Sequence, residues 1–120
     1  MGKFAVSKAW HRNIAVGDIV LVSFPFSDLK GQKVRPALVV AKAEFNDLIL
    51  CQITSKPYSS KIAIRLEPAD FKLGNLPVVS FVRPDKLFTA DQTIVGGIAG
   101  KLRKTTSSKV LRKIRSLFAV

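Results

Sequence analysis

Hydrophobic residues along the chain occur in short runs separated by turn-forming residues, a pattern typical of β-structure. Runs rich in Val, Ile and Leu predict strands, and the clusters of Pro, Gly, Asn, Asp and Ser between them predict turns. We expect strands over residues 18–24, 34–41, 47–54, 61–66, 78–88 and 94–102, a loop over 25–33 and a short helical turn within 67–76. Several short strands at close intervals indicate a small, closed or partly closed β-barrel.

The hydrophobic period changes near residue 105. Apolar residues then recur at helical spacing, with basic residues off that stripe: Val110, Leu111, Ile114, Leu117 and Phe118. This spacing predicts an amphipathic helix over residues 105–118 that packs one face on the barrel. Thr105, Thr106 and Ser107 each offer an oxygen that can cap its N-terminus. The fold class is therefore mainly β, with a C-terminal α-helix.

Composition limits the chain to one domain and excludes several kinds of site. The 120 residues are 48% hydrophobic, which suits a single core over residues 14–120 preceded by a basic arm at 1–13. One cysteine and one histidine exclude an intrachain disulfide and the usual zinc sites, so neither a metal nor another cofactor is expected. The longest apolar stretch, residues 19–26, is too short to span a membrane, and no signal peptide is evident. We therefore expect a cytoplasmic protein.

The positive charge is concentrated at the two ends of the chain. The formal net charge is +12, yet residues 13–100 hold ten basic residues against all eight acidic ones. Residues 1–12 and 101–120 contain basic residues and no acidic ones. Such ends suit an RNA backbone, an acidic protein or an anionic surface, and charge alone does not choose among these partners.

Two copies of the tripeptide Val-Arg-Pro place Arg35 and Arg83 in similar backbone settings. A residue before proline is restricted to extended backbone, so each arginine is held at a strand-like position. The planar guanidinium group suits phosphate oxygens. An arginine whose charged group simply lies in water is the common alternative.

Further polar residues follow the same strands. Arg83 and Asp85 lie two apart, so their side chains leave one face of a strand and can orient and deprotonate a hydroxyl near a phosphate, or form an ordinary surface ion pair. Thr54, at a strand end, can donate to a phosphoryl oxygen or close a turn. Cys51 alternates with hydrophobic residues and is expected to be a buried structural thiol. His11 lies before any periodic structure and is a poor catalyst candidate.

Several segments in order resemble the PemK/MazF family of toxin endoribonucleases. The segments that resemble the beginning of that family's sequence are GDIVLV at 17–22, FPFSDL at 24–29 and RPALV at 35–39. Downstream, the similar segments are QITS at 52–55, SFVRPDKL at 80–87 and IAGKL at 98–102, followed by the helix. The resemblance covers roughly residues 17–118, and the order and spacing of the segments make it specific.

The resemblance implies an SH3-like barrel that forms a homodimer and acts as the toxin of a type II toxin–antitoxin system. It implies growth inhibition through metal-independent, sequence-specific cleavage of single-stranded RNA, leaving a 2′,3′-cyclic phosphate and a 5′-hydroxyl. It also implies an acidic antitoxin whose segment occupies the RNA groove, and DNA binding as a complex with that antitoxin.

The resemblance also assigns roles to particular residues. It implies catalysis by Arg35 and Thr54, or by Arg83 and Asp85, with Asp85 as the candidate base and the arginines stabilising charge on the phosphate. The loop at 25–33 lacks the histidine that some relatives carry. Residues expected to contact RNA are Ser27, Asp28, Lys30, Lys33, Gln52, Ser55, Lys56 and Lys86.

Two other functions remain open. A non-catalytic SH3-like module could use its basic ends to hold nucleic acid or an acidic protein. A toxin of the same fold could instead bind DNA gyrase, as related barrels do. The combination of Arg35, Thr54, Arg83 and Asp85 favours the ribonuclease.

Overall fold

A computed structural model describes residues 14–25, 32–57 and 60–120. The predicted basic arm at 1–13, including His11, lies outside the described residues. So do three of the residues expected to contact RNA, Ser27, Asp28 and Lys30. In the part of the chain that the structure describes, no helix is long and apolar enough to cross a membrane.

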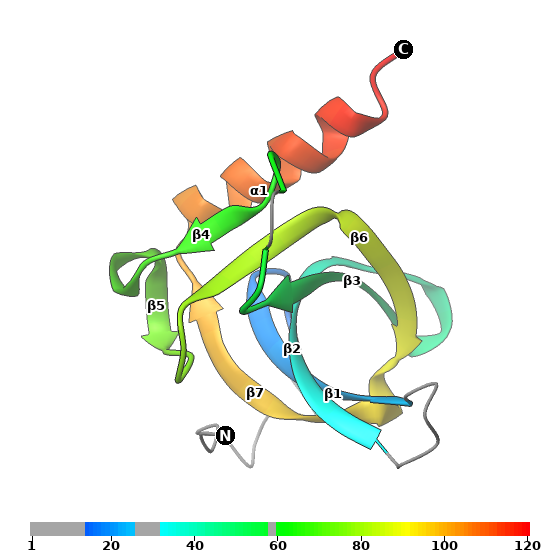
Figure 1. Cartoon of the computed structure of the whole chain (residues 1–120). Helices are drawn as coiled ribbons and strands as arrows, with labels where there is room; N and C mark the ends of the chain where they lie inside the picture. Colours follow the sequence, from blue (N-terminus) through cyan, green and yellow to red (C-terminus); the bar gives the residue numbers. More distant parts are fainter. Residues whose placement is uncertain (1–13, 26–31, 58–59) are drawn as a thin grey trace.

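The chain forms one curled antiparallel sheet with a helix across it (Figure 1). The strands lie in the order β4-β6-β3-β2-β1-β7-β5, so β4 and β5 form the two edges. The elements are β1 (Asp18–Pro25), β2 (Gln32–Lys42), β3 (Asp47–Thr54), β4 (Ile64–Leu66), β5 (Phe71–Gly74), β6 (Ser80–Asp91), β7 (Val95–Leu102) and α1 (Lys104–Leu117). Short 3-10 turns lie at Glu44–Asn46, Pro68–Asp70 and Gln92–Ile94. The barrel and its C-terminal helix confirm the predicted fold class.

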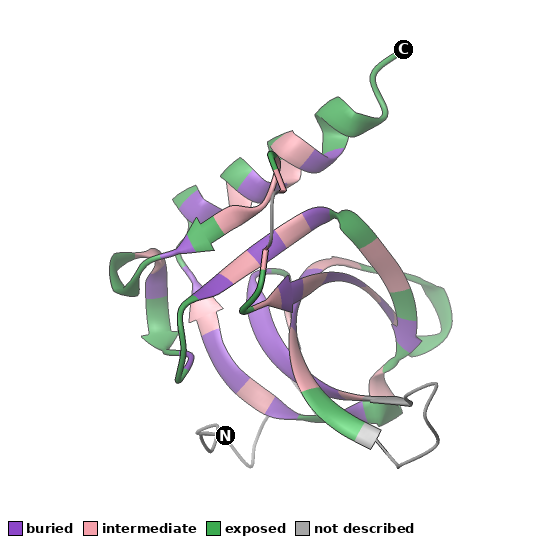
Figure 2. Ribbon diagram, viewed as in Figure 1, coloured by how far each residue is buried: buried purple, intermediate pink, exposed green. Residues whose placement is uncertain are grey.

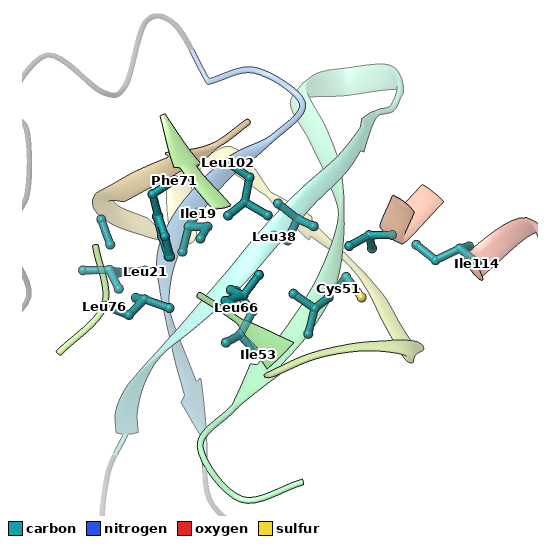
Figure 3. Packing of buried hydrophobic residues seen from close by; sticks show 13 residues of the cluster. Ile19, Leu21, Leu38, Cys51, Ile53, Leu66, Phe71, Leu76, Leu102 and Ile114 are labelled. Carbon is teal, nitrogen blue, oxygen red and sulfur yellow. The ribbon is translucent and has the colours of Figure 1, made fainter. Parts of the chain in front are cut away.

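Both faces of the central strands are buried, which explains why their sequences are almost continuously hydrophobic. Successive side chains of a strand point to opposite faces. In β1, Ile19 and Leu21 therefore join one core cluster while Val20 and Val22 join another. The first cluster, drawn in Figure 3, contains Ile19, Leu21, Leu38, Cys51, Ile53, Leu66, Phe71, Leu76, Val82, Ala99, Leu102, Val110 and Ile114. The second contains Ile14, Val20, Val22, Ala37, Val39, Leu48, Leu50, Ala90 and Val95.

Helix α1 covers the first cluster with only part of its predicted apolar stripe. Val110 and Ile114 are buried, whereas Leu117 and Phe118 are 42% and 68% exposed. Figure 2 shows this change from buried to exposed towards the C-terminal end of the helix. The expected packing of the whole stripe is therefore wrong for its last turn, which extends beyond the barrel. The helix has an amphipathic stripe that the described residues cover only in part.

The expected N-terminal caps of α1 are also wrong. The helix begins at Lys104, and Arg103 holds the N-cap position without a side-chain cap. Thr106 instead lies inside the first turn, where its buried hydroxyl donates to Asp70 Oδ1 at 2.8 Å. Asp70 belongs to the turn that the sequence predicted after Pro68. This hydrogen bond fastens the helix to the segment before β5.

The sequence analysis missed β5 as a strand, because it is only four residues long. Gly74 of this strand faces Gly100 of β7. The approach is so close that a Cβ atom added to Gly100 would lie 2.7 Å from the carbonyl oxygen of Leu73. Glycine at position 100 therefore allows the backbones of β5 and β7 to approach closely.

We expect Gly100→Ala to lower the free energy of unfolding by about 1–3 kcal/mol, because the backbone of β5 must move to admit the methyl group. Thermal or urea unfolding measures the change. Gly96→Ala is the matched control, since the nearest atom to its added Cβ lies 3.7 Å away, an ordinary contact. Equal stability of the two variants would contradict the close approach.

Candidate functional site

The candidate site lies where the second core cluster ends and polar residues take its place. Ala37 on β2 pairs with Gln52 on β3, and the buried side chains of Val39 and Leu50 continue the same face. Because alternate residues share a face, Arg35 and Thr54 project from it as well. A face that is hydrophobic within the barrel thus becomes polar at its rim.

Arg35 and Thr54 line one pocket of about 190 Å³. The pocket combines cationic and hydroxyl groups with apolar walls, a mixture that suits the phosphate and the base of a nucleotide. Its lining consists of Lys33, Val34, Arg35, Pro36, Ile53, Thr54, Ser55, Leu76, Pro77, Val78 and Ser80. The structure therefore brings together one predicted catalytic pair, with Lys33 and Ser55 from the predicted RNA contacts.

Of the two roles that its sequence position suggested for Thr54, the structure shows the closing of a turn. Its Oγ1 accepts a hydrogen bond from the backbone N–H of Lys56 at 3.0 Å, which closes the turn after β3. The Thr54 hydroxyl also donates to the carbonyl oxygen of Lys56, but this contact is long, at 3.4 Å. A bound phosphoryl oxygen can replace that weak acceptor without opening the turn.

Arg83 and Asp85 form a bidentate ion pair on β6, the strand on the other side of β3. Nη2 of Arg83 donates to Oδ2 of Asp85 at 2.8 Å, and Nε donates to Oδ1 at 3.3 Å. The two side chains are 24% and 34% exposed. Thr54 pairs with Phe81, two residues before Arg83, so the ion pair lies on the strand next to Thr54. The pair is not part of the lining of the Arg35 pocket.

The surroundings of Asp85 lower the pKa of its carboxyl group. Partial burial acts to raise this pKa, but hydrogen bonds from Arg83 and from the backbone amide of Asp85, with the charges of Arg83 and Lys86, outweigh it. Asp85 is thus ionised at neutral pH and accepts hydrogen bonds there. A lowered pKa also makes the carboxylate a weaker base.

The remaining predicted RNA contacts lie around these two groups. Gln52 is half-buried at the centre of the face, in register with Ala37. Lys56 is exposed in the turn that Thr54 closes. Lys86 is exposed beside Asp85. All three lie on the strands or turns that carry the predicted catalytic residues.

Sequence reasoning missed one wall of the pocket. Leu76, Pro77 and Val78 come from the segment between β5 and β6, and Val78 is 56% exposed. The sequence predicted a helical turn within 67–76 and a strand from residue 78, whereas β6 begins at Ser80. The available signal in the sequence was the apolar run at 76–78, directly after the turn-forming residues Gly74 and Asn75.

A second feature that the sequence did not reveal is the contact between Cys51 and the backbone of β6. The Cys51 Sγ donates to the carbonyl oxygen of Arg83 at 2.8 Å. Between Cys51 and Ile53 the register of β3 against β6 shifts, and β6 bulges over the residues that carry Arg83 and Asp85. The thiol therefore anchors the bulged segment to the core.

We expect Cys51 in the folded protein to resist modification by a disulfide reagent at about pH 8. The thiol is fully buried, and burial, together with the negative charge of Asp85, raises its pKa to about 12. With a colorimetric disulfide reagent, the folded protein should give almost no colour. Protein unfolded in guanidinium should give the colour expected for one thiol per chain. Rapid reaction of the folded protein would contradict this burial, which the sequence predicted.

Comparisons with known proteins agree with this fold. A search by sequence found no match among curated proteins. Among solved structures, MazE–MazF from Deinococcus radiodurans has a TM-score of 0.70 at 20% identity, covering 88% of this chain and 95% of that one. An endoribonuclease in complex with its cognate antitoxin, from a mycobacterial species, has a TM-score of 0.67 at 15% identity, covering 89% and 94%. The toxin MazF-mt6 of Mycobacterium tuberculosis has a TM-score of 0.64 at 17% identity, covering 84% and 95%.

These likenesses concern the fold, because the identities are low. A sequence match to a family model is evidence of family membership, because it spans residues 15–118, nearly the whole chain. This range contains all four predicted catalytic residues, Arg35, Thr54, Arg83 and Asp85. The chain therefore belongs to the family described as PemK-like, MazF-like toxins of type II toxin–antitoxin systems.

Proposed function

We propose that the protein is an endoribonuclease toxin that cleaves single-stranded RNA without a metal ion. The observation that carries this proposal is the arrangement of Arg35 and Thr54 in one pocket, with the Arg83–Asp85 ion pair on the neighbouring strand β6. Solved proteins of the same fold include endoribonucleases. Two guanidinium groups, a hydroxyl and a carboxylate on neighbouring strands suit phosphoryl transfer better than simple protein binding.

The chemistry uses the RNA's own nucleophile. The 2′-oxygen forms a bond to the adjacent phosphorus while the bond from phosphorus to the 5′-oxygen breaks, which leaves a 2′,3′-cyclic phosphate and a 5′-hydroxyl. Arg35 and Arg83 stabilise the charge that grows on the non-bridging oxygens, and the Thr54 hydroxyl positions one of them. The proton of the 2′-hydroxyl passes to Asp85, and the leaving 5′-oxygen takes a proton from solvent.

The ion pair defines what Asp85 contributes. Its lowered pKa keeps the carboxylate ionised and ready to accept a proton, although as a weak base. The same bidentate contact, made by Nε and Nη2, holds the Arg83 guanidinium in a fixed orientation. Asp85 is therefore assigned both as base and as the group that orients Arg83.

The direct test is to incubate purified protein with a mixed-sequence single-stranded RNA in EDTA and to map the new ends. We expect cuts at a recurring short motif, with cyclic phosphate on one side and a 5′-hydroxyl on the other. Intact RNA with retained RNA binding would instead support a binding module. Inhibition of gyrase with intact RNA would support the gyrase-directed alternative.

We further propose two protein partners, an acidic antitoxin and a second copy of the chain. Structures of the same fold include complexes with antitoxins. Leu117 and Phe118 leave an apolar surface at the end of α1, where a second copy can pack. Light scattering on the purified chain should give twice the monomer mass of 13.2 kDa. A mass of one protomer at micromolar concentration would contradict the dimer.

A further inference from the structure

A second, larger groove lies between the sheet edge at β4 and helix α1, away from the candidate RNA site. Its volume is about 730 Å³, and it shares no residue with the Arg35 pocket. Figure 1 shows β4 running alongside α1, with β6 on its other side. The groove is lined by Lys61, Ile62, Ala63, Ile64, Arg65, Glu67, Asp70, Lys109, Arg112, Lys113 and Ser116.

One wall of the groove is a stripe of basic residues on α1. Arg112 and Lys113 lie three and four residues after Lys109, and Ser116 lies four and three residues after them, so the four lie on one face of the helix. Lys109 and Arg112 are exposed. This wall therefore presents three positively charged side chains to a ligand in the groove.

The acidic residues of the groove are already engaged. Oε1 of Glu67 forms an ion pair with Nε of Arg65 at 2.9 Å. Asp70 accepts from the Thr106 hydroxyl at 2.8 Å and from the backbone N–H of Glu67 at 2.6 Å. The lining holds five basic residues against these two acidic ones, so its net charge is positive and favours an anionic ligand.

The other wall is the edge of a sheet. Among the strands of the described sheet, β4 pairs only with β6, so its outer side carries backbone donors and acceptors that no strand pairs. Ala63, Ile64 and Arg65 line the groove in succession, and since the backbone N–H of Ala63 already donates to Ser60 Oγ at 3.1 Å, the unpaired main chain is that of β4. The side chains of Ile62 and Ile64 are half-buried and add apolar surface.

We infer that the groove between β4 and α1 binds an extended acidic peptide, which adds a strand to β4 and directs carboxylates at the basic stripe of α1. An added strand needs alternating donors and acceptors along its backbone, which a peptide has. An RNA backbone offers phosphate acceptors but no such alternation. The apolar floor further suits a peptide in which acidic and apolar residues alternate.

The test measures binding of a fluorescently labelled peptide of alternating glutamate and valine by anisotropy. The double variant Lys109→Glu, Lys113→Glu should bind it about tenfold more weakly or worse, because two attractions become repulsions. The matched control is Lys104→Glu, Arg115→Glu, which makes the same charge change on the same helix outside the groove. The control should bind within about twofold of wild type. Melting temperatures establish that both variants fold.

A second measurement uses only the wild-type protein and so does not depend on any variant. The same peptide, methylated on alternate backbone nitrogens, keeps its charge but cannot pair fully with β4, and should bind about tenfold more weakly. Equal binding of the two peptides would overturn strand addition. Equal losses in the two double variants, or no peptide binding at all, would overturn the site.

The same assay tests the alternative that the groove binds RNA. A labelled oligouridylate should bind the groove variant and the control variant equally, since the groove holds none of the residues proposed for RNA cleavage. Selective loss of oligouridylate binding in the groove variant, without peptide binding in wild type, would make the groove a nucleic-acid surface and overturn the inference. RNA cleavage is measured separately, so its failure would leave the peptide result standing.

Discussion

Replacing Arg35 by alanine should lower the rate of RNA cleavage by about 10²–10³-fold, with little change in stability. Arg35 and Thr54 line the same pocket, and a guanidinium placed there acts on charge that develops only in the transition state. The loss should therefore appear in kcat rather than in KM. Single-turnover cleavage of a labelled RNA oligonucleotide at saturating protein measures it.

Two further variants separate charge from geometry. Arg35→Lys keeps the positive charge but loses the planar fork, so it should recover only part of the lost rate. Arg115→Ala removes an exposed arginine of α1 outside the pocket and should cleave like wild type. If Arg35→Ala and Asp85→Ala both cleaved RNA at the wild-type rate, the proposed site would be wrong.

The strands of this fold could be predicted because their hydrophobic runs are long compared with their turns. β1, β3 and β7 lie within one residue of their predicted bounds, since each is a run of apolar residues ended by turn-forming ones. β5 escaped prediction because Phe71–Gly74 is only four residues long, too short for its alternation to stand out, and the strand exists through its pairing with β7. The N-cap of α1 escaped for a similar reason, because Asp70 takes the hydroxyl of Thr106 that local sequence offered as a cap.

The candidate site could be predicted as residue types but not as an arrangement. The spacing of Arg83 and Asp85 predicts a shared face, and the structure gives the pair two hydrogen bonds. Nothing in the sequence reveals that β6 bulges there, since the bulge is defined by its register against Cys51 and Ile53 of β3. The apolar wall at Leu76 likewise depends on where a connecting segment folds back. Contacts between distant segments are what the local pattern cannot encode.

Replacing Asp85 by asparagine should lower kcat by about 10²-fold or more, because the amide keeps much of the shape of the carboxylate but cannot accept the proton of the 2′-hydroxyl. Asparagine also retains one oxygen for the Arg83 contact, so part of the orientation survives. The rate is measured in single turnover with the same RNA as for Arg35→Ala. Lys86→Ala, the exposed neighbour, is the matched control and should change mainly KM.

The pH dependence of Asp85 follows from the direction of its pKa shift. Its pKa is lowered from the ordinary value of 3.8, so the carboxylate stays ionised as the pH falls from about 8 to 5 and loses its charge only below its ordinary value. Protonation of Asp85 therefore cannot reduce the rate within that range. A fall in the wild-type rate centred near pH 6 that disappears in Asp85→Asn would contradict the lowered pKa.

A double-mutant cycle with Arg83→Ala separates the two roles of Asp85. If the carboxylate acted only by orienting Arg83, Asp85→Asn would cost nothing further once the guanidinium is gone, since there would be nothing left to orient. If it accepts the proton, the loss persists in the Arg83→Ala background. We expect a loss of about tenfold or more to persist, smaller than in the wild-type background because the ion pair contributes to both effects. Complete disappearance of the loss would reassign Asp85 as a positioning residue and leave the base to another group.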